Sequence, residues 1–335
     1  MYKKIGISPV KKKGNIYICN MKPLVSVVVP VRNRENLIVR CLESIENQSY
    51  RPLELIVVDN DSTDNTRSIV NLWKTAKESG DFKIKILTES YEGACPTRQK
   101  GLENVAGEYV IFFDSDDVMR PNLIETAETV FNQNPGVDVV CWPCCIHQLD
   151  GSLKIPPFMP DKPIEGHLIH TLFRPQGTMF KTSFINKIGG WSRSIPVWND
   201  FELGLRVILN NGKIKGVNRV LADIYAQENS ITGKNFSSKQ GLWEKTLELM
   251  KDENRKSTHP RKKIINEIID YRKIILAAQY QREGNKSTAK SLLNSALSNK
   301  SKLRKFALLF SYHFTKAGCR GAWRIIGKTF MIDGR

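Results

Sequence analysis

The chain has 335 residues, of which 41% are hydrophobic and 25% are charged, a composition typical of a globular protein with enough apolar material for a core. This length favours one large domain with an appendage. No apolar run approaches the roughly 20 residues of a transmembrane helix, and the N-terminal stretch NIYIC is too short for the apolar part of a signal peptide. We therefore expect a cytoplasmic protein.

The net charge of +17 is concentrated at the two ends of the chain. Residues 1–22 carry +6 and residues 236–335 carry +14, which leaves −3 for residues 23–235. An enzyme that acts on nucleic acid would carry its positive charge around the active cleft, so this distribution excludes DNA or RNA as substrate. The charge pattern predicts a basic N-terminal extension (1–22), a main domain (23–235) and a basic C-terminal region (236–335).

The main domain begins with an alternation of strands and helices. Continuous apolar runs predict strands at 24–30, 53–59 and 108–114, because strands covered on both faces of a parallel sheet do not alternate. A further strand is predicted at 83–89. Helical patterns at 36–48, 63–80 and 97–107 separate the strands. This order is typical of an α/β fold with a Rossmann-like, mostly parallel sheet.

Polar residues follow three of these strands at the same edge of the predicted sheet, where ligands bind in open α/β sheets. They are Pro30, Val31, Arg32 and Asn33, then Asp59 and Asn60, then Asp114, Ser115 and Asp116. Each loop alone could be an ordinary turn or helix cap. The third strand also runs straight into three carboxylates, which is electrostatically unfavourable without a cation. Together the three loops predict a ligand site that includes a cation.

Seven cysteines, an odd number spread over a large chain, do not form a disulfide pattern. The segment CWPCCIH at residues 141–147 has a spacing reminiscent of a zinc site. It lies on an apolar stretch and lacks a second Cys/His pair at a suitable distance. We therefore expect buried core cysteines.

The C-terminal region is predicted to be helical. Residues 277–297 form two helices joined at Gly284 and Asn285, and residues 301–330 carry seven Lys or Arg, no acids and several aromatic residues. Such a segment is typical of an interfacial helix on an anionic membrane. It could equally be a solvated helical appendage whose apolar face packs on the main domain.

Five segments in order resemble the inverting family 2 glycosyltransferases of the GT-A fold. They begin with VSVVVPVRNRENLIVRCLESIENQSYRPLELIVVDNDSTDNT and continue with RQKGLENVAGEYVIFFDSDD, GTMFKTSFINKIGGW, WNDFELGLR and YAQENSIT. The resemblance covers about residues 24–232 and is of the bacterial surface-polysaccharide type. It implies that residues 23–235 are the catalytic domain.

The resemblance implies a nucleotide-sugar donor (UDP-, dTDP- or GDP-sugar) bound by the residues of the three loops together with Arg98. Asp114-Ser115-Asp116 is similar to the family's DxD motif. It implies that Asp116 coordinates Mn²⁺ or Mg²⁺ and that Asp114 holds the ribose or a metal-bound water. Asp117 is expected near the sugar or in a helix cap.

The resemblance places the general base at Asp200 in WNDFELGLR; the simpler alternative is that Asp200 only caps a helix at 201–209. Glu202 is expected to support the acceptor site or its loop. Trp191 and Trp198 are expected in the acceptor wall, where they could stack on a sugar or merely pack.

Three residues depart from the family pattern. Asn60 stands where many members have an acid, although an amide can still pair with a nucleobase. Asn199 replaces the usual Glu before the catalytic Asp. Gln227 stands where relatives often have a metal-reaching His and is expected to ligate only weakly.

The expected acceptor is a saccharide or lipid-linked saccharide, with the enzyme peripheral on the inner face of a bacterial cytoplasmic membrane. A sugar nucleotidyltransferase is a second possibility, although the loop after the first strand lacks the Gly-rich, Lys-anchored form that binds phosphates. A catalytically inactive sugar-binding relative is a third, and the joint presence of Asp114, Asp116 and Asp200 argues against it.

Overall fold

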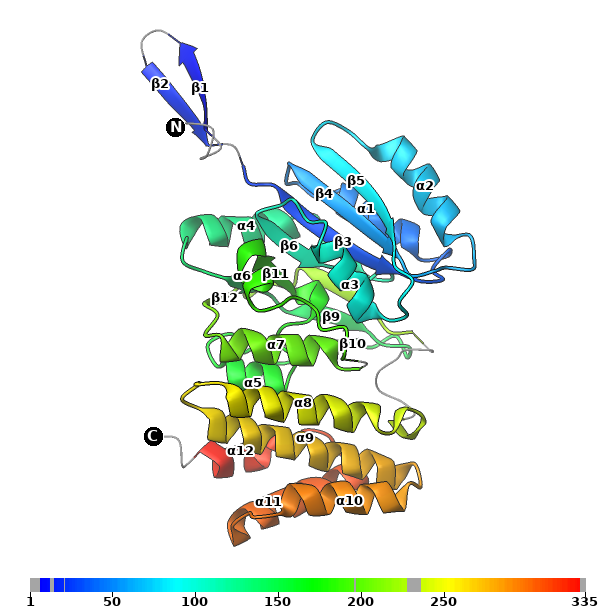
Figure 1. Cartoon of the computed structure of the whole chain (residues 1–335), viewed down its shortest axis with the longest axis vertical. Coiled ribbons are helices and arrows are strands. Elements are labelled where there is room, and N and C mark those ends of the chain that lie inside the picture. Colours follow the sequence, from blue (N-terminus) through cyan, green and yellow to red (C-terminus); the bar gives the residue numbers. More distant parts are fainter. Residues whose placement is uncertain (1–6, 13–14, 21, 196, 228–235, 332–335) are drawn as a thin grey trace.

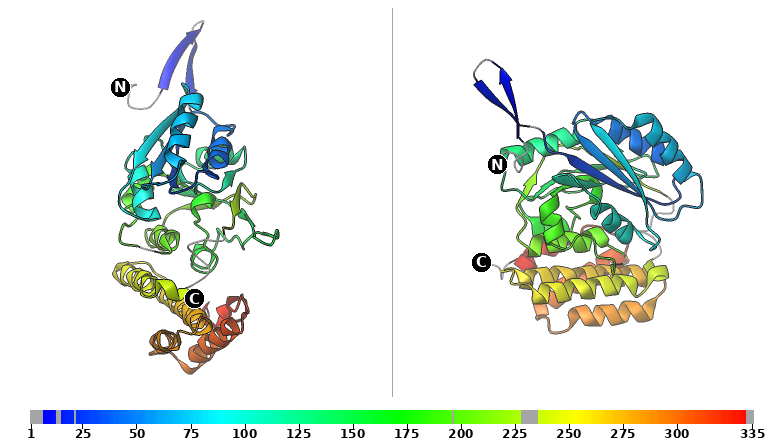
Figure 2. Two further views of the ribbon diagram at one scale, coloured as in Figure 1. Left: turned by 90° about the vertical axis from the view of Figure 1, so that its right-hand side faces the viewer. Right: turned by 45° about the horizontal axis from the view of Figure 1, so that its top comes forward.

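The computed structural model describes residues 7–12, 15–20, 22–195, 197–227 and 236–331. Three parts follow one another along the molecule, with an N-terminal hairpin at one end and a helical region at the other (Figures 1 and 2). The hairpin pairs β1 (Ile7–Lys12) with β2 (Asn15–Asn20) in antiparallel orientation. Between these parts lies a domain built on a central sheet.

The central sheet has seven strands in the order β12-β8-β11-β6-β3-β4-β5. Its parallel half contains the four predicted strands, and β11 joins β6 to β8 in antiparallel orientation. The strands are β3 (Val25–Val31), β4 (Leu53–Asp59), β5 (Phe82–Thr88), β6 (Tyr109–Phe112), β8 (Val139–Cys141), β11 (Thr178–Lys181) and β12 (Ile214–Gly216). The α/β prediction is confirmed, although β6 ends at Phe112, before the carboxylates rather than with them.

Helices cover both faces of this sheet, which explains its continuous apolar strands. Val25, Val27 and Val29 pack on one face with α1 (Ile38–Glu46), α2 (Thr66–Lys77) and α4 (Leu123–Gln133). Val28 and Phe112 pack on the other face, together with α3 (Ala94–Leu102), α5 (Pro163–Leu168), α6 (Thr182–Lys187) and α7 (Asn199–Leu209). Successive strand residues thus serve two separate cores.

A smaller sheet of four strands lies beside the carboxyl edge of the central one, in the order β10-β9-β13-β7. Its strands are β7 (Val118–Met119), β9 (Cys144–His147), β10 (Leu153–Lys154) and β13 (Ala222–Tyr225). Strand β7 directly follows residues Asp114 to Asp117, which we call the acidic segment. Strand β13 pairs with β7. The acidic segment is therefore held between the two sheets.

The C-terminal region is helical, as predicted, and shares the core of the main domain. Its helices are α8 (Leu242–Lys256), α9 (Lys262–Arg282), α10 (Lys286–Leu297), α11 (Lys302–Lys316) and α12 (Trp323–Met331). Helices α9 and α10 meet at Gly284, whose φ of +86° suits glycine. Trp243, Ile268 and Leu308 belong to the same hydrophobic cluster as Phe112. Among the described residues, no helix is long and apolar enough to cross a membrane.

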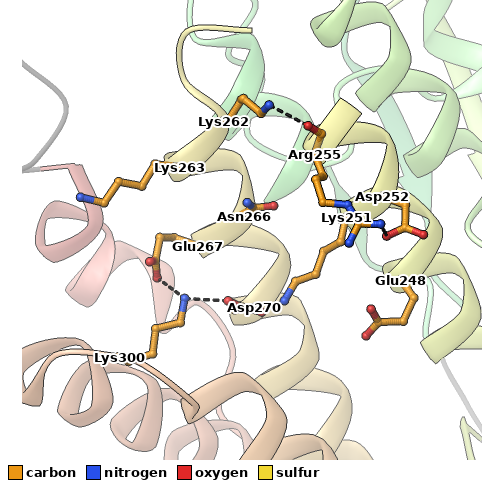
Figure 3. Close-up of a pocket in the computed structure, with 10 residues that line it drawn as sticks. All are labelled: Glu248, Lys251, Asp252, Arg255, Lys262, Lys263, Asn266, Glu267, Asp270 and Lys300. Carbon is orange, nitrogen blue, oxygen red and sulfur yellow. Dashed lines mark hydrogen bonds and ion pairs between the residues drawn. The ribbon is translucent and has the colours of Figure 1, made fainter. Parts of the chain in front are cut away.

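Buried charges in the helical region are paired with one another (Figure 3). Lys300 Nζ lies 3.0 Å from Glu267 Oε2 and 2.7 Å from Asp270 Oδ2, and Arg304 Nη1 lies 3.1 Å from Glu267 Oε1. Lys251 also contacts Asp270. Lys251, Glu267, Asp270 and Lys300 border a pocket of about 460 Å³ that is lined by both acidic and basic side chains. The pairing satisfies charges that would otherwise be costly to bury.

Candidate active site

The loops after β3 and β4 are tied together at the carboxyl edge of the sheet. Asn60 N donates to Val31 O at 2.8 Å, while Asn33 accepts from Thr63 N at 2.8 Å and donates its own N–H to Ser62 Oγ at 3.0 Å. Asn33 has a φ of 51°, a left-handed conformation that Asn tolerates well. The predicted donor-site segments from the first two strands therefore lie next to each other.

The residues predicted to bind the donor differ in how exposed their side chains are. Val31 and Ser115 are buried, so only their backbone could meet a ligand. Arg32 is half exposed and pairs with Glu92 at 2.6 Å. Pro30, which directly precedes Val31, is half-buried.

Asp59 and Asn60 are used to build the loops. Asp59 Oδ1 accepts from the backbone N–H and the hydroxyl of Ser62. Asn60 Nδ2 donates to Glu89 O at 2.7 Å and Tyr91 O at 2.8 Å, and its Oδ1 accepts from Gly93 N at 2.9 Å. Both amide N–H groups of Asn60 are thus taken, so the expectation that they face a nucleobase is wrong for this structure. A buried amide must find partners, and the backbone of residues 89–93 supplies them.

Asp114 is held by two side chains. Arg98 Nη2 donates to Asp114 Oδ1 at 2.6 Å, and Gln176 Nε2 donates to Asp114 Oδ2 at 2.6 Å. Arg98 lies on the buried face of α3, which approaches β3 so closely that a Cβ on Gly101 would lie 2.3 Å from Val28 Cγ1. Burial disfavours the Arg98 cation, but Asp114 outweighs it and raises the pKa of Arg98. The Asp114 carboxylate is therefore held in place by two hydrogen-bond donors, one of them charged.

Asp117 is 2% exposed and faces the smaller sheet, which excludes the expected position beside a sugar. Gln176 Nε2 also donates to Asp117 Oδ2 at 2.6 Å, and Tyr225 N donates to Asp117 Oδ1 at 2.9 Å. It caps no helix, because its backbone partner belongs to β13. Burial, together with the charges of Asp114 and Asp116, raises the pKa of Asp117 to about 8. Asp117 is a structural link between the acidic segment and β13.

Asp116 has the weakest partner of the three carboxylates. Its nearest cation is Arg34, with Nε 3.5 Å from Asp116 Oδ2, while Arg40 Nη2 donates to the backbone oxygen at 2.6 Å. Burial, and then the charge of Asp114, raise the pKa of Asp116, although Arg34 opposes them. Asp116 thus carries negative charge that the protein leaves largely uncompensated.

The acidic segment fits a hard divalent cation by its chemistry. Its donors are carboxylate oxygens, which Mg²⁺ and Mn²⁺ prefer. The raised pKa of Asp116 shows that added positive charge would be favourable there. Asp114 has a hydrogen-bond donor on each oxygen, so Asp116 is the better placed of the two to hold an ion.

Asp200 lies in the first turn of α7, which begins at Asn199 instead of the predicted 201. Trp198 is the N-cap residue, so the alternative in which Asp200 caps the helix is wrong. Asp200 Oδ1 accepts from its neighbour Phe201 N at 2.9 Å. Burial raises the pKa of Asp200, while the charges of Arg174 and Arg98 oppose that rise. The carboxylate is thus half-buried, without an ion pair among the described residues, and more basic than an exposed one.

Arg98 connects the acidic segment with the helix that carries Asp200. Its Nη1 donates to Asn199 Oδ1 at 3.1 Å, while its Nη2 holds Asp114. The substitution at Asn199 thus has a structural role that the sequence did not reveal.

The two tryptophans predicted in the acceptor wall pack inside the protein to different degrees. Trp191 is only 2% exposed and packs against Phe112 and the Arg98 guanidinium, so stacking on a sugar is wrong for this residue. Its neighbours all belong to the sheet face that α3 covers. Trp198 is half-buried and lies beside Trp243 and Phe201. Trp198 stays a candidate for acceptor contact.

Glu202 is 1% exposed and is part of a loop support, not of a surface that faces a ligand. It forms an ion pair with Arg206, which also donates to Ile188 O at 2.6 Å and Gly190 O at 2.7 Å. Glu202 is thus linked through Arg206 to the loop at residues 188–190, and its role in supporting an acceptor site stays a prediction.

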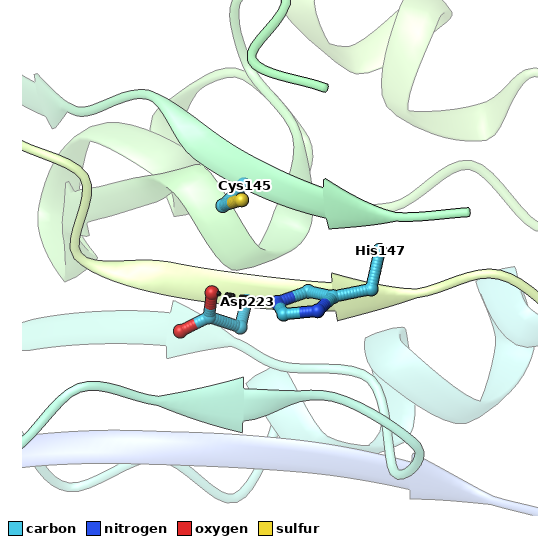
Figure 4. A group of neighbouring side chains, drawn as sticks. All are labelled: Cys145, His147 and Asp223. Atoms are coloured by element: carbon cyan, nitrogen blue, oxygen red, sulfur yellow. Dashed lines mark hydrogen bonds and ion pairs between the residues drawn. The ribbon is translucent and has the colours of Figure 1, made fainter. Parts of the chain in front are cut away.

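The cysteines of CWPCCIH are buried, as expected, but one of them lies near two further metal-type ligands (Figure 4). Ligand atoms of Cys145, His147 and Asp223 all lie within 4.8 Å of one another. His147 Nε2 contacts Asp223 Oδ1 at 2.9 Å, and Arg120 binds both oxygens of Asp223 at 2.9 and 3.0 Å. Against the effect of burial, these two partners lower the pKa of Asp223. Because Arg120 already neutralises Asp223, the group works as an ion-pair network.

Gln227 lies beyond β13 and donates weakly to Tyr225 O at 3.3 Å. Tyr225 in turn lies under the Arg40 guanidinium, 3.9 Å from its ring centroid. Gln227 is thus two residues from a side chain that is linked to the acidic segment through Arg40. No contact between Gln227 and a carboxylate is present among the described residues.

Sequence reasoning missed Arg34, Arg40 and Gln176, which make direct contacts with the acidic segment. Arg34 and Arg40 could have been found from the basic positions that follow the first strand, because that strand ends at the same edge. Gln176 gave no signal, because it reaches Asp114 from 62 residues further along the chain.

The sheet order and the acidic segment at its carboxyl edge define the GT-A class of fold, and solved structures agree. Staphylococcus aureus TarS 1–349, solved in complex with UDP-GlcNAc, superposes with a TM-score of 0.66 at 17% identity, covering 88% of this chain and 92% of that chain. The mannosyltransferase PcManGT from Pyrobaculum calidifontis, in complex with GDP-Man and Mn²⁺, gives a TM-score of 0.56 at 18% identity, covering 93% and 86%. At these identities the likeness establishes the fold.

Residues 26–183 match the family model described as glycosyl transferase family 2. The match spans just under half of the chain, so residues 26–183 are the part that is similar to glycosyl transferase family 2. A relative from Campylobacter jejuni, named GalNAc(5)-diNAcBac-PP-undecaprenol beta-1,3-glucosyltransferase, is 38% identical over 107 residues, which are 31% of this chain and 33% of that protein. The chain thus matches about a third of the length of such curated relatives.

Proposed function

We propose that the chain is an inverting glycosyltransferase that moves a sugar from a nucleoside-diphosphate donor to a saccharide hydroxyl. The observation that carries this proposal is the bridge through Arg98. Its guanidinium contacts Asp114 at the acidic segment and Asn199 beside Asp200, so one side chain joins the two carboxylate sites that such a reaction needs.

On the donor side, Asp116 and Asp114 would hold Mn²⁺ or Mg²⁺, with the Gln227 side-chain oxygen as a weaker ligand. The ion would neutralise charge on the departing diphosphate, an effect worth several kcal/mol. Arg32, Asn33 and Asp59 line the adjoining loops and are assigned to the nucleotide, whose base is uracil, thymine or guanine. Arg98 holds the Asp114 carboxylate in place.

On the acceptor side, Asp200 would accept the proton of the attacking hydroxyl. The acceptor oxygen forms a bond to the anomeric carbon while the bond from that carbon to the diphosphate oxygen breaks. The anomeric configuration therefore inverts. The raised pKa of Asp200 suits a base, because proton transfer is most efficient when the pKa of the base lies nearer the working pH.

We assign the acceptor to the lipid-linked saccharide class. The C. jejuni relative is named for an undecaprenol-linked substrate. Such an acceptor would give the enzyme a reason to work at the inner face of a membrane, and helix α11 offers a surface for that position. Leu303 and Phe306 are 62% and 71% exposed on its outer side, next to the exposed Lys302 and Lys305.

The inner side of the same helix limits this surface. Leu308 and Trp323 of the basic segment are buried in the core, and Arg304 pairs with Glu267. The proposed membrane surface is therefore the outer side of α11 together with Ile325, which is 59% exposed. Each Lys or Arg near an anionic bilayer contributes up to about 1 kcal/mol of binding free energy.

Co-sedimentation with anionic vesicles tests the membrane surface. The double variant Leu303→Ser/Phe306→Ser should lose most binding at low salt. The matched control Leu72→Ser, which changes a side chain 73% exposed on α2, should bind like the wild type. Wild-type protein that stays in solution at low salt would refute membrane docking.

A product assay tests the function itself. With a panel of UDP-, dTDP- and GDP-sugars and Mn²⁺, a glycosyltransferase releases a nucleoside diphosphate. Release of pyrophosphate would identify a nucleotidyltransferase instead. Neither product from any donor, with donor binding intact, would identify an inactive sugar-binding relative.

A further inference from the structure

Two arginines from distant parts of the chain lie near the first turn of α7, which carries Asp200. Arg272 contacts the Trp198 and Phe201 rings. Arg174 directly follows Phe173, whose ring lies 5.0 Å from that of His167, and His167 is bonded to Phe201 O. Arg174 follows α5, and Arg272 lies on α9 of the helical region. Arg174 donates to Thr171 O at 2.8 Å and His170 O at 3.0 Å. Both arginines are half-buried, and neither forms an ion pair among the described residues.

Aromatic rings fix the position of Arg272. Its guanidinium carbon lies 4.8 Å from the ring centroid of Phe201 and 5.3 Å from that of Trp198. These rings belong to the first turn of α7 and its N-cap, on either side of Asp200 in the sequence. Cation–π contact restricts the rotamers of Arg272 and leaves its N–H groups available for hydrogen bonds.

The lack of an ion-pair partner distinguishes Arg174 and Arg272 from Arg98 and Lys300, which are paired with carboxylates. Arg98 contacts Asp114, and Lys300 contacts two carboxylates. Burial lowers the pKa of both Arg174 and Arg272, and Asp200 is the one carboxylate that opposes this effect on both. Arg98 also acts on Asp200 but is already paired with Asp114, so Arg174 and Arg272 leave a surplus positive charge beside Asp200.

We infer that Arg174 and Arg272 bind a phosphate group of the acceptor, next to the hydroxyl that Asp200 deprotonates. This inference rests on the proposed function, which assigns the base to Asp200. When Asp200 takes up a proton, the surplus at the site grows from one positive charge to two. A phosphate diester or diphosphate would balance it, and guanidinium groups bind phosphate oxygens in pairs.

The alternative role of the two arginines is only to adjust the basicity of Asp200. That role needs no ligand, so it predicts no anion binding at this place. A carboxylate on the acceptor is a second alternative, because guanidinium groups bind both kinds of oxyanion.

Calorimetric titration of the full chain with methyl phosphate, in metal-free buffer with chelator and at low salt, tests the inference. The wild type should bind saturably. Arg272→Gln and Arg174→Gln should each weaken binding at least about tenfold, while Arg272→Lys, which keeps the charge, should keep most of it. Asp200→Asn should tighten binding several-fold, because it removes the negative charge that competes with phosphate.

Two variants serve as controls. Arg34→Gln removes the guanidinium beside Asp116, where the donor diphosphate is proposed to bind, and should leave methyl phosphate binding unchanged. Arg219→Gln changes a surface arginine whose guanidinium donates to Thr126, and it should also have no effect. Melting by circular dichroism shows whether each variant is folded. If a Gln variant is not, the Arg272→Lys and Asp200→Asn titrations decide.

Equal binding in the wild type and both folded Gln variants would overturn the inference, as would loss of binding in Arg34→Gln. Absent binding in the wild type, or no change in Asp200→Asn, would leave the arginines as modifiers of Asp200 only. Acetate that binds as tightly as methyl phosphate would contradict the phosphate assignment. Arginine-dependent binding without turnover of any donor would contradict the proposed function but not the phosphate site.

Discussion

Buried charges are paired in the C-terminal helical region and poorly paired at the carboxyl edge of the central sheet. In the helical region, Lys300, Glu267, Asp270 and Arg304 neutralise one another within about 3 Å. At the edge of the sheet, Asp116 has only a cation at 3.5 Å and a neighbouring carboxylate that raises its pKa. The same residue types thus stabilise one region and destabilise the other.

This difference separates structural from functional charge. A protein gains little by leaving a buried carboxylate poorly paired unless a ligand completes it. The uncompensated groups, Asp116 and Asp200 with Arg174 and Arg272, lie at the main domain and its border with α9. The predictions below change one group at a time in either region.

Replacement of Asp116 should have the largest effect on activity and the opposite effect on stability. Asp116→Asn should remove nearly all metal-dependent transfer, because the ion loses its main ligand. The same variant should melt at a higher temperature in metal-free buffer, since repulsion from Asp114 is relieved. A variant with lower thermal stability would mean that Asp116 is a structural charge like those of the helical region.

Replacement of Asp200 should reduce turnover without weakening donor binding. Asp200→Asn should reduce kcat by about 10²-fold or more, because general base catalysis is lost. Donor affinity should stay within about twofold of wild type, as the side chain acts on the acceptor. Glu202 is not an alternative base, since it is buried against Arg206. Wild-type turnover in Asp200→Asn would contradict the assignment of Asp200 as the base.

Loss of a paired charge in the helical region should affect stability alone. Lys300→Met leaves Glu267 and Asp270 with fewer partners and should lower the free energy of unfolding by about 3 kcal/mol. Lys74→Met, on α2, removes the exposed ion-pair partner of Glu78. It should lower the free energy of unfolding by about 0.5 kcal/mol or less. Denaturant titration measures both. Equal effects of the two changes would remove the distinction between buried and exposed pairs.

An effect confined to acid pH concerns stability at the contact between α5 and α7. Burial lowers the pKa of His167 to about 3, although the hydrogen bond that its Nε2–H donates to Phe201 O at 2.8 Å opposes this shift. Between pH about 3 and 6.5 the unfolded chain binds a proton here that the folded chain does not. The free energy of unfolding should therefore fall by up to about 1.4 kcal/mol per pH unit as the pH decreases through this window. His167→Gln should reduce that slope, and an unchanged slope would exclude His167 as its source.

The sequence predicted the fold well where the signal is local. Strands β3, β4 and β5 have bounds within one residue of those expected, because long apolar runs between turns leave few alternatives. The position of Asp114 and Asp116 followed from the same rule, since strand ends meet at one edge of the sheet. The junction of α9 and α10 at Gly284 was likewise visible as a helix stop signal.

The contacts that complete the site were not predictable, because they join residues far apart in the chain. Gln176 reaches Asp114, and Arg272 reaches the rings of α7 from the helical region. The burial of Trp191 depends on how α3 packs over the sheet. The residues around position 191 do not reveal this packing. Asn60 was interpreted through a family pattern, whereas its partners are backbone groups of a loop with no motif.

The most direct test of the central claim, that the acidic segment is a cation-dependent nucleotide site, is nucleotide binding with and without metal. Calorimetric titration with UDP, dTDP and GDP should show tight binding of at least one nucleotide by the wild type in Mn²⁺. That binding should weaken at least tenfold in chelator and in Asp116→Asn with Mn²⁺. Equally tight nucleotide binding under all three conditions, or no binding under any, would contradict the account.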